Sequence, residues 1–173
     1  KDLVAQIKEL NTGKYLHEVL EANHKSDFCI GVAGYPEKHL EAPSLQTDLK
    51  RLKEKVAAGA DYVVTQMFFD NQKYFQFVAA ARAAGIEVPI IPGIKPLAIK
   101  RHLQLLPQVF RIDVPEPLIT AVEGCKTNKE VRQVGIEWAI QQSRELLAAG
   151  VPVLHYYSMG KSDNVHAIAS ELF

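Results

Sequence analysis

The stretch Val63-Val64-Thr65-Gln66-Met67-Phe68-Phe69-Asp70 decides how this chain is expected to fold. Its apolar, largely β-branched residues predict a strand over 62–68 that carries an amide, Gln66, and an aromatic pair to its carboxyl end. A side-chain amide both donates and accepts hydrogen bonds, and aromatic faces suit a flat ring ligand. The alternative is that Gln66 is an ordinary polar residue at a strand end and that the phenylalanines belong to the core.

Three further apolar runs predict strands over 28–34, 88–91 and 152–157. The first is apolar almost throughout, which is typical of a strand buried on both faces. Pro92-Gly93 is expected to stop the third strand, because proline cannot donate to a ladder.

Helical periodicity and capping residues fill the intervals between these strands. Ser44 is expected to cap a helix that Gly59 ends, and Asn71 a helix that Gly85 ends. Leu45, Leu49, Leu52 and Val56 form the apolar stripe of the first of these two helices. The complete set of expected helices is 1–10, 15–22, 44–58, 71–84, 98–106, a short one after Pro115, 128–149 and 162–173.

Alternating strands and helices predict an α/β fold with a parallel sheet. A doubly wound sheet normally has a glycine-rich phosphate loop after a strand, and this chain has none. A (β/α)8 TIM barrel instead places functional groups at the carboxyl ends of its strands. Polar and aromatic residues gather at those ends here: Tyr35, Glu37, Gln66, Phe68, His155, Tyr157 and Ser158. We therefore expect residues 1–173 to form a single domain that is half of such a barrel, since four strands are half of eight.

Composition excludes several classes of partner. Apolar residues make up 47% and charged residues 23% of the 173 residues, and the formal net charge is zero. This balance indicates neither nucleic acid nor an anionic membrane surface as a partner, and no apolar run approaches the ~20 residues of a membrane span. Cys29 and Cys125 follow no metal or redox spacing and are expected to be free thiols of a cytoplasmic protein.

The histidines predict no metal site, because His39, His102 and His155 do not fall at ligand spacing with one another or with a cysteine. The chain opens on Lys1 rather than methionine, and this residue falls inside the helix expected over 1–10. We expect it to be part of a longer polypeptide.

The loop Tyr35-Pro36-Glu37-Lys38-His39 and the helix after it form a candidate binding site. Pro36 stiffens the loop and presents Tyr35 and His39. Asp48 and Lys55 are seven residues apart on one helix flank, where they suit a ribose hydroxyl and a phosphate. The alternative is a solvated charged flank that also includes Arg51 and Glu54.

Five segments taken together resemble the methylenetetrahydrofolate reductase family. They are 33–42, 48–60, 65–69, 91–94 and 154–157, and they occur in the same order and register as in that family. The resemblance spans 28–173. It is to the bacterial catalytic barrel, and it covers the carboxyl-terminal half, roughly the last four β/α units.

The resemblance implies a flavoprotein of one-carbon metabolism and methionine supply. Such an enzyme uses FAD and NAD(P)H to reduce 5,10-methylenetetrahydrofolate to 5-methyltetrahydrofolate, in a cytoplasmic homo-oligomer. Carried over by position, the expected FAD-binding residues are Tyr35, His39, Ala42, Asp48, Arg51 and Lys55. The expected folate-binding residues are Gln66, which also meets the nicotinamide, together with Phe68, His102, Tyr157 and Lys161.

This chain departs from the family pattern at several positions. Arg51 and Glu54 replace an asparagine and an arginine, His102 replaces a glutamine, and Lys161 replaces an arginine. Lys161 keeps the positive charge but loses the bidentate fork. The family's general acid, a glutamate, precedes the matched half. Because loss of such an acid typically costs 10²–10⁴-fold in rate, this chain alone is expected to be inactive.

Two alternatives remain. One is a non-catalytic half-barrel that binds a flavin or nucleotide and acts as a self-association module. The other is a different barrel flavoenzyme of the proline dehydrogenase type.

Overall fold

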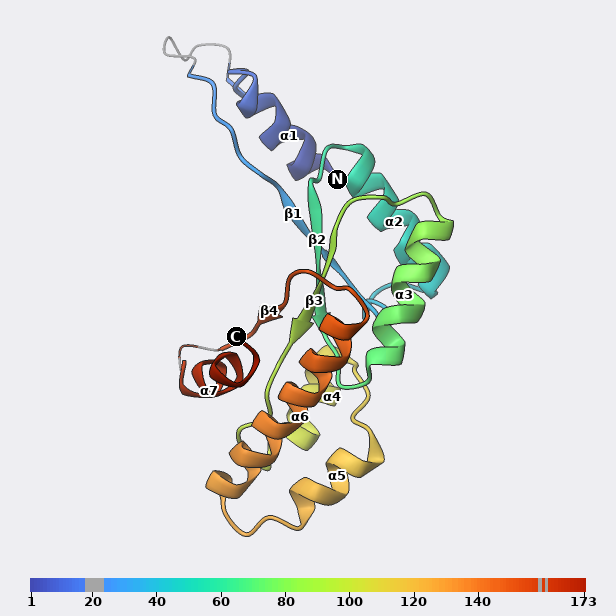
Figure 1. The fold of residues 1–173 in the computed structure, drawn as a ribbon. Coiled ribbons are helices and arrows are strands. Elements are labelled where there is room, and N and C mark those ends of the chain that lie inside the picture. Colours follow the sequence, from blue (N-terminus) through green and yellow to red (C-terminus); the bar gives the residue numbers. More distant parts are fainter. Residues whose placement is uncertain (18–23, 159, 161) are drawn as a thin grey trace.

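The computed structural model describes residues 1–17, 24–158, 160 and 162–173 (Figure 1). Its strands are β1 (Gly31–Gly34), β2 (Tyr62–Met67), β3 (Ile90–Ile94) and β4 (His155–Tyr156). Its helices are α1 (Asp2–Asn11), α2 (Leu45–Ala57), α3 (Asn71–Ala83), α4 (His102–Phe110), α5 (Glu116–Glu123), α6 (Asn128–Ala148) and α7 (Asp163–Leu172). None of these helices is long and apolar enough to cross a membrane.

The strands form one sheet in the order β1-β2-β3-β4, and every neighbouring pair is parallel. A doubly wound sheet reverses its strand order at a switch point. The sequential order found here is instead that of consecutive strands in a (β/α)8 barrel. The prediction of an α/β fold with barrel connectivity is confirmed.

The main core lies between the sheet and helices α2, α3, α6 and α7. Leu52, Phe77, Leu146 and Ile168 come from these four helices and pack in one cluster with Val63 of β2. Of the expected α2 stripe, Leu49 and Val56 pack against this cluster, whereas Leu45 is exposed.

The opposite face of the sheet is much less covered. Along β2 the side chains of Val63, Thr65 and Met67 are buried, while the residues between them are only half-buried. On β1, Gly31 and Ala33 are exposed. The expectation that the first strand is buried on both faces is therefore wrong, because β1 is an edge strand and no helix of the described residues covers its second face.

The strands also differ in extent from their prediction. β1 and β4 are shorter than 28–34 and 152–157, and β3 runs through Pro92-Gly93 instead of stopping before it. A register irregularity between Val64 and Met67 of β2 lies opposite this proline. A proline is tolerated where the ladder is already interrupted. Gly93 N donates instead to a side-chain oxygen, Thr65 Oγ1, over 2.9 Å.

Several helix boundaries shift as well. Ser44 caps α2 as expected, but α3 is capped by Asp70, whose side chain accepts from Gln72 N over 2.9 Å. Asn71 is instead a buried helical residue that donates to Gln142 O. The helix expected over 98–106 begins at His102. Residues 15–17 are not helical, and the rest of the helix expected over 15–22 lies outside the described residues.

Candidate functional site

A cavity of about 420 Å³ lies between the β1–α2 loop and helix α2; we call it the α2 cavity. Its lining residues are Tyr35, His39, Glu41, Ala42, Pro43, Thr47, Asp48, Arg51 and Lys55. This set includes all six residues that the sequence predicted to hold FAD. The structure therefore brings the loop and the charged helix flank to one place.

Two hydrogen bonds fix the geometry of the α2 cavity. His39 N donates to Asp48 Oδ2 over 2.8 Å, which ties the loop to the first turn of α2. Lys55 Nζ donates to the carbonyl of Ala33 over 2.8 Å, which ties α2 to strand β1. The alternative interpretation required Asp48 and Lys55 to be freely solvated. These two hydrogen bonds contradict it.

Burial and charge set the electrostatics of the α2 cavity. Burial lowers the pKa of Lys55, although the nearby Asp48 acts in the opposite direction. Burial raises the pKa of Tyr35, and the charge of Asp48 adds to this effect. The rings of Tyr35 and His39 pack edge to face with centroids 4.6 Å apart. The cavity thus combines aromatic surface with two acids, Glu41 and Asp48, and a partly desolvated cation, Lys55.

Arg51 fits the alternative of a solvated flank better than Lys55 does. Its guanidinium contacts Glu54 over 3.1 Å, and the arginine side chain is 67% exposed. An exposed pair of this kind contributes little to stability. Arg51 is therefore free to exchange Glu54 for a ligand anion at small cost.

Gln66 stands on the open face of β2, within the irregular stretch between Val64 and Met67. Its Oε1 accepts from the amide of Met67 over 3.0 Å. Bulges re-aim side chains and are common beside binding sites. The irregularity therefore presents the amide group of Gln66 at the carboxyl end of the strand, as the sequence predicted.

Tyr157 packs against the carboxyl end of β2 because Gly93 leaves room for its ring. Its hydroxyl donates to the carbonyl of Thr65 over 2.9 Å. A Cβ at Gly93 would come within 2.7 Å of the Tyr157 ring, so only glycine leaves room for it. His155 packs edge to face on the same ring, with centroids 4.6 Å apart. Burial, aided by the charge of Tyr35, raises the pKa of Tyr157.

A second cavity, of about 360 Å³, lies beside α4, and we call it the α4 cavity. It is lined by Met67, Lys95, Ala98, His102, Leu105, Leu106, Val109, Phe110, Arg132, Ser158, Asp163 and Asn164. Burial and the charge of Lys95 lower the pKa of His102, and the ring accepts from Ala98 N over 3.3 Å. The predicted residue His102 is therefore neutral near pH 7 and faces a largely apolar cavity.

One predicted substrate residue needs correction. Phe68 is fully buried and stacks on Tyr74 with centroids 5.5 Å apart. The expectation that it meets a ligand is wrong in this structure, because its side chain points into the helix-side core rather than out of the sheet. Lys161 lies outside the described residues.

Sequence reasoning missed Lys95 and Arg132. Lys95 directly follows β3, so the rule that functional groups collect at strand carboxyl ends would have found it. The rule failed here because the strand was expected to stop at Ile91. Arg132 projects from near the N-terminal end of α6 and had no local signal.

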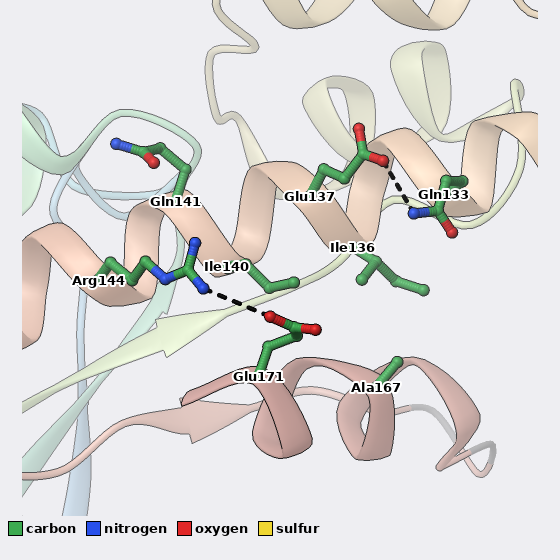
Figure 2. Close-up of a pocket in the computed structure, with 8 residues that line it drawn as sticks. All are labelled: Gln133, Ile136, Glu137, Ile140, Gln141, Arg144, Ala167 and Glu171. Carbon is green, nitrogen blue, oxygen red and sulfur yellow. Dashed lines mark hydrogen bonds and ion pairs between the residues drawn. The ribbon is translucent and has the colours of Figure 1, made fainter. Parts of the chain in front are cut away.

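A third cavity, between α6 and α7, has a different character (Figure 2). Ile136 and Ile140 point toward α7, and beside them an Arg144–Glu171 ion pair of 3.5 Å bridges the two helices. Gln133 donates to Glu137 over 2.8 Å. Because these polar groups pair with one another between outer helices, the cavity is not a candidate site.

Glu37 links the β1–α2 loop to the α4–α5 loop. We expect its protonation to make the free energy of unfolding depend on pH. Its Oε2 accepts from Asp113 N over 2.9 Å. Burial raises the pKa of Glu37 to about 7, against the opposing effects of this hydrogen bond and, more weakly, of the Lys73 charge. Between pH 4.5 and 7 the unfolded chain has lost this proton and the folded chain keeps it. The free energy of unfolding therefore falls as pH rises through that window.

Glu37→Gln is expected to remove this dependence. It should leave stability at pH 4.5 unchanged and raise it at pH 8 by roughly 1 kcal/mol, a value discounted for solvent screening. Urea unfolding at the two pH values measures the difference. The exposed Glu87→Gln serves as a control, and equal pH profiles for Glu37→Gln and the parent chain would contradict the assignment.

Comparison with known proteins decides the family. Residues 1–172 match the family model described as methylenetetrahydrofolate reductase. The chain belongs to the methylenetetrahydrofolate reductase family. This membership overturns the alternative of a proline dehydrogenase type of flavoenzyme.

Curated members of the methylenetetrahydrofolate reductase family are longer than this chain. The 5,10-methylenetetrahydrofolate reductase of Pectobacterium carotovorum subsp. carotovorum is 38% identical over 147 residues, which are 84% of this chain and 49% of that protein. Methylenetetrahydrofolate reductase 1 of Schizosaccharomyces pombe is 35% identical over 154 residues, which are 88% of this chain and 26% of that protein. The chain thus spans about half of the bacterial relative and about a quarter of the yeast one.

A solved structure shares the fold of this family member. It is described as an uncharacterized protein from Clostridium thermocellum that binds two copies of 5-methyl-5,6,7,8-tetrahydrofolic acid. It matches with a TM-score of 0.53 at 19% identity, over 83% of this chain and 52% of that chain. The likeness shows the fold alone, a barrel of which this chain covers about half.

Proposed function

We propose that this chain is part of a cytoplasmic methylenetetrahydrofolate reductase that uses FAD and NAD(P)H to reduce 5,10-methylenetetrahydrofolate to 5-methyltetrahydrofolate, supplying methyl groups for methionine. The α2 cavity is the observation that carries this proposal, because it gathers all six residues expected to hold FAD. Family membership and a structural neighbour described as binding 5-methyltetrahydrofolate support the substrate class.

The chemistry of the α2 cavity fits a dinucleotide. Lys55 and Arg51 supply cations for a diphosphate. Asp48 uses one carboxylate oxygen on His39 N, and its second oxygen suits a ribose hydroxyl. Tyr35 and His39 supply aromatic faces. Bound FAD supplies hydride-transfer chemistry, and the residues of the chain bind it, orient it and keep water away.

Gln66 and Tyr157 are the residues that we propose to lie against the folate substrate. The amide of Gln66 has one oxygen engaged with Met67 N and offers its NH₂ group to a heterocycle. The Tyr157 ring lies at the end of β2, where the hydrogen bond from its hydroxyl to the Thr65 carbonyl holds it. His102, from the wall of the α4 cavity, offers a neutral imidazole to the same ligand.

Proton supply for folate reduction is expected from outside these 173 residues. The resemblance places the family's glutamic acid before the matched segment, and among the described residues no carboxylic acid forms a hydrogen bond with the Gln66 side chain. We therefore expect this chain to bind ligands and to show no folate turnover by itself.

FAD titration tests the proposal. Binding to the 173-residue chain should shift the flavin absorbance spectrum, and Lys55→Met should weaken FAD affinity at least tenfold because it removes the desolvated cation of the α2 cavity. Lys50→Met, an exposed change on the same helix outside the cavity, is the matched control. No spectral shift with the parent chain, or equal affinity for Lys55→Met and parent, would refute the assignment; circular dichroism checks folding.

The open face of the sheet favours a second candidate function, a non-catalytic flavin-binding half-barrel that self-associates. Gly31, Ala33 and His155 are exposed on strands β1 and β4, which are the two edges of the sheet. Unpaired strand edges are templates for pairing with another chain. FAD binding together with a sedimenting dimer and no NADH–menadione oxidation would support this function, whereas a compact monomer would count against it.

A further inference from the structure

We propose that Lys38 is a positioning residue of the α2 cavity, which holds the turn 39–42 in the shape that receives a dinucleotide. The inference rests on the proposed function, because it concerns how the proposed FAD site is kept ready for its ligand. His39 and Ala42 line the α2 cavity, whereas Lys38 does not. The role of Lys38 is therefore exerted through the turn and not by contact with the ligand.

The backbone of Lys38 is strained. Its φ is 81°, and Arg111 is the one other non-glycine residue with a positive φ in the described part of the chain. A residue that carries a Cβ is disfavoured in this left-handed region, so keeping a lysine there costs free energy. Strain of this kind persists only where the surrounding contacts enforce it, and it is concentrated at ligand sites. The contacts of the Lys38 side chain therefore show what enforces it here.

The side chain of Lys38 folds back over its own loop. Its Nζ donates to the carbonyl of His39 over 3.0 Å and also to the carbonyl of Ala42. The amide of Ala42 donates to the same His39 carbonyl over 3.1 Å, which closes the turn. Hydrogen bonds from an ammonium group are stronger than neutral ones. One half-buried side chain thus binds both ends of the turn.

Burial does not explain the shape of this turn. Leu40 is 55% exposed, and Glu41 and Pro43 are exposed as well. An exposed segment of backbone gains little from packing and opens easily unless hydrogen bonds hold it. The bonds from Lys38 are therefore well placed to decide whether the turn is ordered before a ligand arrives.

The turn also sets the state of the His39 ring. The amide of Glu41 donates to His39 Nδ1 over 3.2 Å, so in the neutral ring the proton lies on Nε2. The same ring packs edge to face on Tyr35. The turn thus fixes two aromatic residues that line the α2 cavity. A site ordered in advance loses less conformational freedom on binding and so binds more tightly.

FAD titration of Lys38→Met tests the proposal. The affinity should fall about tenfold, because the ligand must then order the turn itself. Lys50→Met, at an exposed position of α2 outside the cavity, should bind FAD as the parent chain does. Lys38→Gly is a second variant that keeps the backbone shape, since glycine adopts a positive φ without strain. It should unfold at nearly the same urea concentration as the parent chain, yet bind FAD more weakly.

A double-mutant cycle with His39→Ala separates positioning from simple attraction of the ligand by the Lys38 charge. If Lys38 acts through the turn, Lys38→Met should cost much less affinity in the His39→Ala background than in the parent chain. The loss should also persist at high salt, which screens attraction between separated charges. Fully additive losses, or a loss that disappears at high salt, would overturn the positioning role.

The titrations also separate this inference from the proposed function. If the parent chain binds FAD and Lys55→Met weakens that binding, the proposed FAD site stands. Unchanged FAD affinity in folded Lys38→Met or Lys38→Gly would then refute the role of Lys38 alone. A parent chain that does not bind FAD would refute both.

Discussion

Gly135→Ala is expected to lower the free energy of unfolding by about 3 kcal/mol, the upper part of the range for overpacked sites. A Cβ at this position of α6 would lie 2.0 Å from the carbonyl oxygen of Leu97 and 2.7 Å from its carbonyl carbon. These are backbone atoms of the β3–α4 segment, so no side chain can rotate away. Helix α6 would have to move from the segment that carries Lys95.

Urea unfolding measures this effect, with Gly124→Ala as the control. A Cβ at Gly124 would meet its nearest atoms at 3.6 Å, an ordinary contact. The control should change stability by no more than about 0.5 kcal/mol. If Gly135→Ala unfolds at the same urea concentration as the parent chain, the close approach of α6 to Leu97 is not the packing of the protein in solution.

Phe68→Ala is expected to cost 3–5 kcal/mol, the usual range for a deleted buried aromatic ring. Phe68 is fully buried, and the change would also remove its stacking with Tyr74. Since whole domains are stable by only about 5–15 kcal/mol, this variant should be close to unfolding at physiological temperature. Phe28→Ala, at a residue 58% exposed, should have little effect.

Phe68→Leu separates a core role from a ligand role. It keeps most of the buried volume, so the fold should survive with a loss of about 1 kcal/mol. Its affinity for 5-methyltetrahydrofolate should match that of the parent chain, because the ring does not reach the open face of the sheet. A folded Phe68→Leu chain with strongly weakened binding would restore the ligand contact that the sequence suggested.

The α2 cavity was the most predictable part of the site. Its residues come from one loop and the helix that directly follows it, so a seven-residue spacing was enough to place Asp48 and Lys55 on a common flank. Gln66 was predictable for a similar reason, because it stands at the end of a clearly apolar strand.

The α4 cavity could not be predicted in the same way. Lys95 and Arg132 meet only because α6 packs against the segment after β3, and that approach depends on the missing side chain of Gly135. The side of β2 that Phe68 faces depends on the irregularity opposite Pro92-Gly93, which involves two strands. An apolar run shows that a side chain is buried, but not on which side of the sheet.

The sequence by itself determined the order and type of the elements and the parallel alternation of the strands. These features follow from short-range forces, since capping, turn formation and apolar periodicity act within a few residues. The tertiary structure alone decided which face of the sheet stays open, where the strands end, and which charged side chains of the described residues become buried. Those features depend on contacts between segments distant in the chain, and there backbone packing and desolvation outweigh local preference.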